Sequence, residues 1–412
     1  MSEAGRVLLV ANNFPPVRGG SAVVYDSLAR FAAGRLVVVA ARLHYADGLP
    51  LIGWREHDRH APYRVRRLAL LRTVIQPEPL RARWRRAGFL FADIAIRLRL
   101  ALALLWWVWR ERAGAVCLGE LVASSWVIHL FRFVPWVRVV VYVHGEEITT
   151  ADPYDPGGVR RRRALLAADA VVVVSRFTLV AVHALLAGAR VQKRGRLPDI
   201  RLIENGVDTA RFRPLGRSAD LAALYGLDGC FVFVAVCRLL EKKGLDQALR
   251  AFAVVGAAHP HCRFLIVGGG PYRPTLEAIA GELGVTPRVV FAGEVAEAEL
   301  VSFYCLGDVF VMPNRELPNG DTEGFGLVFL EANACGLPVI AGSDGGSIDA
   351  VRDGFNGLLV DGQSVGAIAE AMLALRRDPP LYDRLRAGGL DAAAAADWRH
   401  KARAFVALFD TP

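Results

Sequence analysis

The 412-residue chain contains six cysteines, with no Cys-x-x-Cys pair and no regular spacing between them. Disulfide scaffolds and structural zinc sites depend on such pairs, so neither is expected here. Most of the cysteines lie inside apolar runs, which is typical of reduced core residues in a cytosolic protein. Hydrophobic residues make up 53% of the chain and charged residues 22%, so the sequence predicts a well-packed globular protein and excludes disorder.

Long uninterrupted apolar runs are also missing. The longest, residues 89–109, contains Asp93, Arg97 and Arg99, and each would cost about 2.5 to 3.5 kcal/mol at the centre of a bilayer. The chain reaches a strand-like run at Arg6 without the apolar segment of a signal peptide. The sequence therefore predicts a cytoplasmic protein without a membrane-spanning helix.

Several metal and cofactor motifs are absent as well. The chain has no Asp-x-Asp and no His-Glu-x-x-His, and no Pro-Cys-x-x-Cys follows His144-Gly-Glu146, which otherwise matches the His-x-Glu of zinc deaminases. Gly268-Gly-Gly-Pro271 follows a strand-like run but lacks the Gly-x-Gly-x-x-Gly spacing of dinucleotide-binding loops. Metal-dependent hydrolysis and nicotinamide chemistry are thus poorly supported, and we expect neither a metal nor another cofactor.

Charge is divided unevenly along the chain. Residues 1–215 carry 33 Lys and Arg against 17 Asp and Glu, a balance of +16, whereas residues 216–412 carry 17 against 24, a balance of −7. Arginines beside tryptophans, at residues 81–86 and 106–110, are typical of a membrane interface, although tryptophans at helical spacing also occur in cores. No nucleic-acid-binding fold or signature is present. The predicted partner is an anionic membrane surface, contacted peripherally from the cytoplasmic side.

Short, continuously apolar runs separated by helical segments predict the fold class. Such runs are typical of strands buried on both faces of a parallel sheet, and two sets of six predict two α/β domains, each a doubly wound parallel sheet. Ligands of two facing sheets bind at the carboxyl ends of the strands, in the cleft between the domains. The runs are residues 7–10, 36–40, 115–118, 139–143, 170–174 and 201–203, then 231–236, 264–267, 289–291, 309–312, 339–341 and 358–360.

The domain boundary is predicted in the turn-rich connector between Asn205-Gly-Val-Asp208 and Arg213-Pro214. We assign residues 1–208 to a first domain that faces the acceptor and the membrane. Residues 209–392 form a second domain that binds the donor, and a C-terminal helix over about 393–412 is expected to pack back across the seam.

The segment Glu323-Gly-Phe-Gly-Leu-Val-Phe-Leu-Glu331 places two carboxylates around a glycine-rich helix start. Gly324 and Gly326 allow a ligand to approach the backbone, and a helix beginning near Phe325 would direct its unpaired N–H groups at an anion such as a diphosphate. Glu331, six residues into that helix, is placed to accept bonds from the vicinal hydroxyls of a ribose, and Glu323 from a sugar. An ordinary helix with a capping glutamate is the alternative.

A second candidate pair follows the first strand of the second domain. Arg238 and Lys243, five residues apart, are placed to contact one diphosphate, and two fixed cations would offset the charge that develops on a departing nucleoside diphosphate. A solvated helix start would also explain these residues. The nearby carboxylate motif favours the functional interpretation.

With Asn205-Gly-Val-Asp208, Leu265-Ile-Val-Gly-Gly-Gly-Pro271 and Gly336-Leu-Pro-Val-Ile-Ala, most of residues 200–390 resembles the retaining GT-B glycosyltransferases of family 4. Within that family, the sequence resembles the phosphatidylinositol-mannoside mannosyltransferase branch. The resemblance is thinner in the first half. There Phe14-Pro-Pro-Val-Arg-Gly-Gly20 looks like the family's glycine loop, and Val143-His-Gly-Glu-Glu147 like its strand-end histidine.

The resemblance implies a role for each matching residue. His144, Arg238, Lys243 and Glu323 would form the catalytic set, with His144 beside the donor sugar and Glu323 on one of its hydroxyls. Glu331 would hold the nucleotide ribose. Retention in this family is thought to proceed by front-face attack, in which the leaving phosphate acts as the base. The implied donor-binding residues are Gly19, Gly20, Arg238, Lys243, Gly268, Gly324, Phe325, Gly326, Leu327, Val328 and Glu331.

The function predicted from these features is a metal-independent hexosyltransferase with a nucleotide sugar as co-substrate. It would move mannose from GDP-mannose onto a lipid-linked or membrane glycoconjugate, in glycolipid, lipopolysaccharide or exopolysaccharide assembly. Three alternatives stay open: a UDP-sugar donor, a sugar-nucleotide epimerase of the same fold, and a non-catalytic nucleotide-sugar-binding protein.

Overall fold

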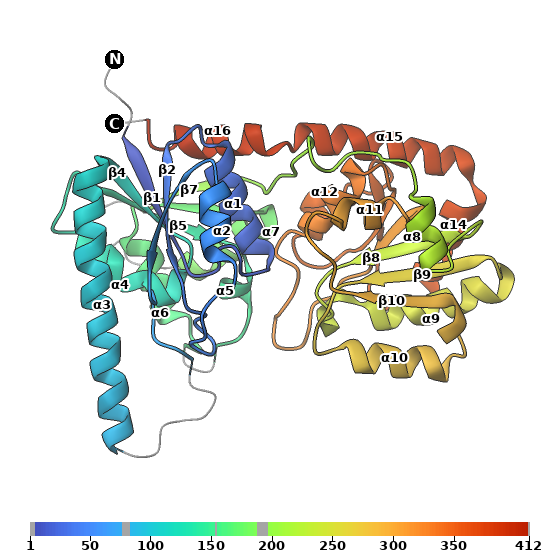
Figure 1. The fold of residues 1–412 in the computed structure, drawn as a ribbon, viewed down its shortest axis with the longest axis horizontal. Coiled ribbons are helices and arrows are strands. Elements are labelled where there is room, and N and C mark those ends of the chain that lie inside the picture. The colour runs from blue at the N-terminus through green and yellow to red at the C-terminus, as the bar shows by residue number, and fades with distance from the viewer. Residues whose placement is uncertain (1–4, 76–82, 153–154, 188–196, 411–412) are drawn as a thin grey trace.

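The computed structural model describes residues 5–75, 83–152, 155–187 and 197–410, and it contains two parallel sheets (Figure 1). Arg81, part of the arginine cluster noted above, lies outside these ranges. The first sheet has the order β3-β2-β1-β4-β5-β6-β7 and the second β10-β9-β8-β11-β12-β13. The doubly wound α/β fold expected from the apolar runs is confirmed, with one strand more in the first sheet than the six predicted.

The elements of the first domain are β1 (Arg6–Ala11), α1 (Gly20–Phe31), β2 (Leu36–Ala41), α2 (Trp54–His60), β3 (Arg64–Leu68), α3 (Arg83–Glu111), β4 (Ala113–Leu118), α4 (Leu121–Phe131), β5 (Arg138–Val143), α5 (Glu146–Thr149), α6 (Val159–Ala167), β6 (Ala170–Val173), α7 (Arg176–Leu186) and β7 (Asp199–Leu202).

The second domain comprises α8 (Ala219–Leu224), β8 (Phe231–Val236), a 3₁₀ turn at Glu241–Lys243, α9 (Leu245–Ala258), β9 (Cys262–Val267), α10 (Arg273–Glu282), β10 (Val289–Gly293), α11 (Leu300–Tyr304), β11 (Val309–Met312), α12 (Leu327–Ala334), β12 (Val339–Gly342), α13 (Ser347–Ala350), β13 (Gly357–Val360), α14 (Val365–Arg377) and α15 (Pro379–Ala395). Helix α16 (Trp398–Ala407) follows.

Burial on both faces explains why the strands read as continuous apolar runs. In β1, Val7 and Leu9 pack into the core on one face of the sheet, while Leu8 and Val10 pack into the core on the other. All four are at most 1% exposed. Fully burying such a side chain contributes about 1.5–3 kcal/mol, so the two-sided core supplies most of the driving force for this domain.

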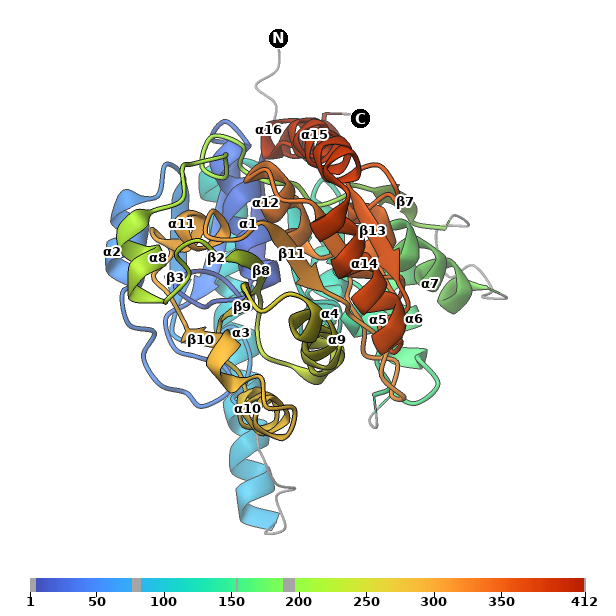
Figure 2. The ribbon, with the colours of Figure 1, turned by 90° about the vertical axis from the view of Figure 1, so that its right-hand side faces the viewer.

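The C-terminal helices cross from the second domain to the first (Figures 1 and 2). Helix α15 packs against α12, and α16 packs against α1 of the first domain. The C-terminal helix was expected from about residue 393, but α16 begins at Trp398. The Asp397 carboxylate caps the helix there by accepting a hydrogen bond from the Arg399 N–H. Phe405 then reaches Tyr142 of β5, with their ring centroids 5.9 Å apart.

Helix α3 is the longest element, and its N-terminal part projects beyond the body of the first domain (Figure 1). Leu100, Leu104 and Val108 in its second half are buried against the sheet. Among the described helices, none is both long and apolar enough to cross a membrane.

Candidate active site

The predicted site residues follow the carboxyl ends of strands in both domains. His144 comes directly after β5, Arg238 shortly after β8, and Glu323 in the segment between β11 and α12. The first and second domains meet here: a Cβ added to Gly324 would lie 2.1 Å from the His144 carbonyl oxygen, and one added to Gly145 would lie 3.3 Å from the Gly324 Cα. The structure therefore brings His144 and Gly324 together across the interdomain cleft.

Two helix starts converge at the same place. A Cβ added to Gly20, the first residue of α1, would lie 4.0 Å from the Leu327 Cδ1, in the first residue of α12. Neither Gly19 nor Gly326, the residues before these helices, supplies a capping side chain. Because the first turn of a helix leaves its N–H groups unpaired, both helices direct donors and positive partial charge at this point.

Helix α12 begins at Leu327, two residues later than the predicted start near Phe325. Gly326 has φ 87°, a left-handed conformation that few other residues adopt, and it turns the chain into the helix. Phe325 is 4% exposed, and its N–H donates to the Glu323 carboxylate. Phe325 thus anchors the loop, Leu327 and Val328 form the helix start, and Glu331 is the fifth residue of the helix.

Lys243 and Glu323 form an ion pair, with the Lys243 ammonium donating to the Glu323 Oε2. The two side chains are 14% and 15% exposed. Burial disfavours the charged form of each side chain, but the attraction between the two opposite charges outweighs this effect. The pKa of Glu323 is therefore lowered and the pKa of Lys243 is raised. Arg238 is exposed beside this pair, and its positive charge acts on Lys243. The structure places all three predicted residues together.

Lys242, which was not selected from the sequence, holds the loop that carries Glu323. Its ammonium lies 2.6 Å from the Asp321 Oδ1 and 3.2 Å from the Thr322 carbonyl oxygen. Gly244, which follows Lys243, packs so closely that a Cβ would lie 1.9 Å from the Pro313 carbonyl oxygen. The signal available was adjacent lysines before a glycine in a chain with only four lysines.

His144 is fixed by two contacts within the first domain. Its backbone N–H donates to the Glu147 Oε1 over 2.8 Å, and its Nε2 lies 2.7 Å from the Tyr25 hydroxyl. That hydroxyl donates its proton to the Gly119 carbonyl oxygen, so Nε2 must be the donor to Tyr25, which leaves Nδ1 unprotonated as an acceptor. Burial lowers the pKa of His144 to about 4, so the ring is neutral at pH 7.

Tyr25 and Glu147 are further residues that sequence reasoning missed. Tyr25 lies 119 positions from His144, and nothing local to either residue indicates the contact. Glu147 stands in the His-Gly-Glu-Glu motif, but its role as an acceptor for the His144 N–H depends on the turn at Gly145. Burial raises the pKa of Glu147 to about 7.

Glu331 points into a buried, polar corner of the second domain. Its Oε2 accepts a hydrogen bond from the Tyr304 hydroxyl over 2.7 Å, and burial raises its pKa. The other oxygen, Oε1, accepts no hydrogen bond within the described part of the chain. The geometry leaves one fixed carboxylate oxygen for a ligand hydroxyl.

Gly268 occupies a close backbone approach. Its φ is +128°, and a Cβ would lie 2.0 Å from the carbonyl oxygen of Cys237, the residue before Arg238. A glycine is therefore required for the ends of β8 and β9 to pack, whether or not a donor also approaches.

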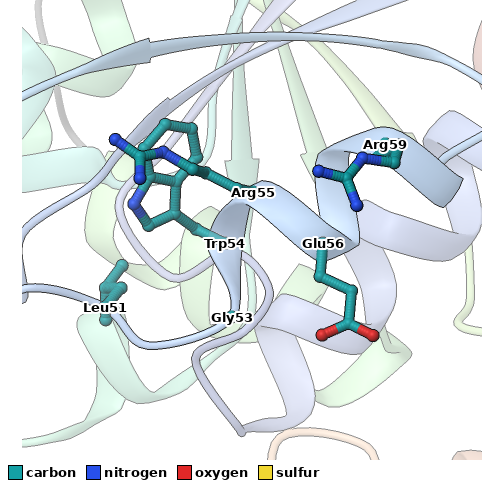
Figure 3. A pocket seen from close by; sticks show the side chains of 6 residues that line it. All are labelled: Leu51, Gly53, Trp54, Arg55, Glu56 and Arg59. Carbon is teal, nitrogen blue, oxygen red and sulfur yellow. The ribbon is translucent and has the colours of Figure 1, made fainter.

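A depression at the start of α2 contains none of the predicted site residues. It has a volume of about 380 Å³, and Figure 3 shows the Arg55 guanidinium stacked over the Trp54 ring, 5.1 Å from its centroid. Its lining residues are Leu51, Gly53, Trp54, Arg55, Glu56 and Arg59.

Comparison with known sequences finds relatives that are named as sugar-transferring enzymes. Residues 227–390 match the family model described as glycosyl transferases group 1. A GDP-mannose-dependent alpha-(1-6)-phosphatidylinositol monomannoside mannosyltransferase of Mycobacterium tuberculosis is 35% identical over 96% of this chain and 94% of its own. A GDP-mannose-dependent monoacylated alpha-(1-6)-phosphatidylinositol monomannoside mannosyltransferase of Corynebacterium glutamicum is 30% identical, over 97% and 95%.

Solved structures share the two-domain architecture. The Anabaena protein HepE, in complex with UDP and glucose, superimposes with a TM-score of 0.74 at 18% identity, covering 99% of this chain and 100% of that one. Sucrose-phosphate synthase from Thermosynechococcus elongatus gives a TM-score of 0.75 at 23% identity, with 98% of each chain covered. The GT-B arrangement of two facing Rossmann-like domains is thereby confirmed.

Proposed function

We propose that this chain, which belongs to the group 1 glycosyl transferases and, within them, to the phosphatidylinositol-mannoside mannosyltransferase branch, transfers mannose from GDP-mannose to a lipid-linked acceptor. The donor and acceptor are proposed from the names of the relatives that are 35% and 30% identical over nearly the whole chain. We further propose that the glycosidic configuration of the donor is retained and that no metal takes part.

One observation carries the proposal: two uncapped helix starts and the Arg238 and Lys243 cations meet at a single point between the domains. Helix N-termini and fixed cations are the protein groups that bind a diphosphate without a metal. The chain has no Asp-x-Asp through which a metal would bridge the phosphates. As the bond to the sugar breaks, negative charge grows on the departing nucleoside diphosphate, and preorganised donors stabilise it.

The remaining residues suit the sugar and the nucleoside. The neutral His144 ring offers Nδ1 as an acceptor for a sugar hydroxyl, and Glu323, fixed by Lys243, offers a second. Glu331 offers Oε1 to the ribose. In the proposed front-face reaction the acceptor hydroxyl gives its proton to the leaving phosphate, so no protein nucleophile is required.

The experiment that tests this function is transfer of labelled sugar by the purified full-length protein. We expect label from GDP-mannose, and not from UDP-sugars, in a lipid product when phosphatidylinositol mannosides are supplied, with the α configuration in that product. Transfer should survive EDTA. Restoration by Mg²⁺ or Mn²⁺ after loss in EDTA would overturn the metal-free mechanism.

The same purified protein, incubated with nucleotide sugars alone, distinguishes transfer from the two other functions left open by the sequence, an epimerase and a non-catalytic binding protein. An epimerase would change the nucleotide sugar without an acceptor. A binding protein would gain about 2.7 kcal/mol of stability from a donor at 100 times its Kd yet turn nothing over.

Changing Glu331 to Gln should weaken donor affinity by about tenfold or more and leave the rate of the bound complex nearly unchanged. The amide keeps the size of the side chain but replaces an ionic acceptor, and hydrogen bonds to charged groups contribute about 1.5–3 kcal/mol. Donor KM and kcat measure the two effects separately. Tyr304→Phe is the matched control, because it removes the orienting partner alone, and a collapsed kcat at unchanged KM would contradict this assignment.

We also propose that α3 holds the protein on the inner face of the membrane. Taken at 100° per residue, seven of its eight exposed large apolar residues fall on one face of the helix, and the eighth, Leu90, lies beside that face on the side away from the arginines. Exposed Arg85, Arg99 and Arg110 form a row along one side of that face. An apolar stripe bordered by arginines is the pattern of a helix lying in an anionic bilayer surface. The stripe consists of Trp84, Phe91, Ile94, Leu98, Leu102, Trp106 and Trp109.

The membrane proposal predicts that the protein floats with anionic vesicles and is released by salt, because exposed charges are screened beyond about 10 Å at 0.1 M ionic strength. Arg85→Ser with Arg99→Ser should weaken binding by about 1 kcal/mol per residue. Phe91→Ser with Leu98→Ser should weaken binding to all vesicles. The control is Leu224→Ser, because this leucine of the second domain is 72% exposed, against 73% for Phe91 and 59% for Leu98. Equal flotation of every variant would make a soluble saccharide the better acceptor.

A further inference from the structure

A pocket of about 790 Å³ lies where the C-terminal end of α3 meets the edge strand β3. Its lining consists of Arg64, Arg66, Trp109, Arg110, Glu111 and Arg112. Strand β3 begins at Arg64, and β1 and β4 begin at Arg6 and Ala113. The pocket therefore lies at the amino ends of the strands, whereas His144 follows the carboxyl end of β5. It is separate from the candidate active site.

The pocket is strongly cationic after its internal ion pairs are counted. Glu111 is the only carboxylate among the described residues of the lining, and its side chain is 2% exposed. It already accepts hydrogen bonds from Arg6, Arg64 and Arg66 over 2.8, 2.8 and 2.6 Å. Burial alone would raise the pKa of Glu111, but Arg66 and Arg64 outweigh it and lower the pKa. Five arginines thus share one negative charge, and Arg110 and Arg112 face solvent.

Two further features point to a ligand. The Nε of Arg66 is buried and has no hydrogen-bond partner among the described residues, and such a buried donor costs about 1–3 kcal/mol unless something accepts from it. Trp109, which is 71% exposed, forms one wall, and its ring centroid is 5.0 Å from that of Trp106. The pocket therefore combines excess positive charge, one buried donor without a partner and an aromatic wall.

We propose that this pocket binds a phosphate monoester or diester group. Several guanidinium forks offer more donors than one carboxylate can accept, whereas a phosphoryl group has up to three acceptor oxygens and matches the fork geometry. The volume leaves room for the organic part of the ligand beside Trp109. The group can belong to a lipid headgroup, since Trp109 is also the last residue of the apolar stripe, or to a soluble phosphate.

The test uses the full-length protein and two probes, inorganic phosphate followed by calorimetry, and phosphatidylcholine vesicles with and without phosphatidic acid followed by flotation. The main variant is Arg110→Gln with Arg112→Asn, because Arg112 has φ 51° and asparagine tolerates that conformation. Arg64→Gln is the second variant, since Arg6 and Arg66 still neutralise Glu111. The charge-matched control is Arg384→Gln with Arg403→Gln, both exposed in the C-terminal helices.

Both pocket variants should bind phosphate or phosphatidic acid vesicles at least about tenfold more weakly than wild type, and the control should bind like wild type. Because all the proteins share the interdomain cleft, phosphate bound there does not contribute to the difference. Loss with inorganic phosphate would identify a soluble ligand, and loss with vesicles alone a lipid headgroup. Equal binding by the pocket variants and wild type, an equal loss in the control, or no binding by wild type would overturn the proposal. These readouts involve no sugar transfer, so they are independent of the proposed transfer activity. Arg110 also belongs to the arginine row of α3, so the vesicle result for the pocket depends on Arg64→Gln, which lies on β3.

Discussion

Replacing Lys243 by alanine is expected to lower kcat/KM by at least about 10²-fold, the scale for losing one preorganised donor that stabilises charge in a transition state. Lys243 is one of two cations at the point where α1 and α12 begin. Its side chain is 14% exposed, and its ammonium is fixed by the ion pair with Glu323. A group fixed in this way stabilises the departing diphosphate without reorganising. Steady-state kinetics with the labelled donor measures the loss.

A drop in activity must be separated from a drop in stability, because Lys243→Ala leaves the Glu323 carboxylate, which is 15% exposed, without its partner. Breaking such a pair is costly, whereas replacing both members is often nearly neutral. Lys243→Met with Glu323→Gln should therefore recover the free energy of unfolding but not the activity. Lys401→Ala, which removes a lysine of α16 paired with Glu204 over 3.2 Å, is the matched control. Retention of more than half of the wild-type activity by Lys243→Ala would remove this residue from the site.

The parallel strands were predictable because burial on both faces leaves continuous apolar runs in the sequence. Strand β3, Arg-Val-Arg-Arg-Leu, was missed for the complementary physical reason. It lies at the sheet edge, where Arg64 and Arg66 reach the Glu111 carboxylate and Arg67 reaches Asp58. A strand whose side chains pair with distant carboxylates has no apolar signature of its own.

In the candidate site, too, features set by neighbouring residues were predictable from the sequence, and contacts between residues far apart in the chain were not. Glu323, Gly324 and Gly326 were predictable, since a turn into a helix leaves its pattern in neighbouring residues. Tyr25 and Tyr304, which orient His144 and Glu331, were not, because those contacts join residues 119 and 27 positions apart. The tryptophans of α3 were ambiguous between core and surface, and the structure assigns Trp84, Trp106 and Trp109 to the surface.

Changing Gly324 to alanine should abolish most of the transfer activity while sparing each domain. The added Cβ would lie 2.1 Å from the His144 carbonyl oxygen, in the opposite domain, and it meets no other group outside the neighbouring residues besides the carbonyl carbon of His144 at 3.3 Å. Gly324 does not have a positive φ, so alanine fits its backbone. The single methyl group therefore acts on the approach of the two domains and on nothing else.

The expected loss is at least about 10²-fold in kcat, because a displacement of about 1 Å between reacting groups is enough to cause it. Donor affinity should fall much less than kcat, since Arg238, Lys243 and Glu331 all belong to the second domain and only the start of α1 comes from the first. The control is Gly366→Ala, where a Cβ meets nothing within 4 Å and φ is not positive; alanine should stabilise that helix by about 0.5–1 kcal/mol. If Gly324→Ala instead lost donor binding or unfolded at a lower temperature, the glycine would be needed inside its own domain. If it kept full activity, the close contact between His144 and Gly324 would not belong to the reacting state, and His144 would lose its place beside the donor sugar.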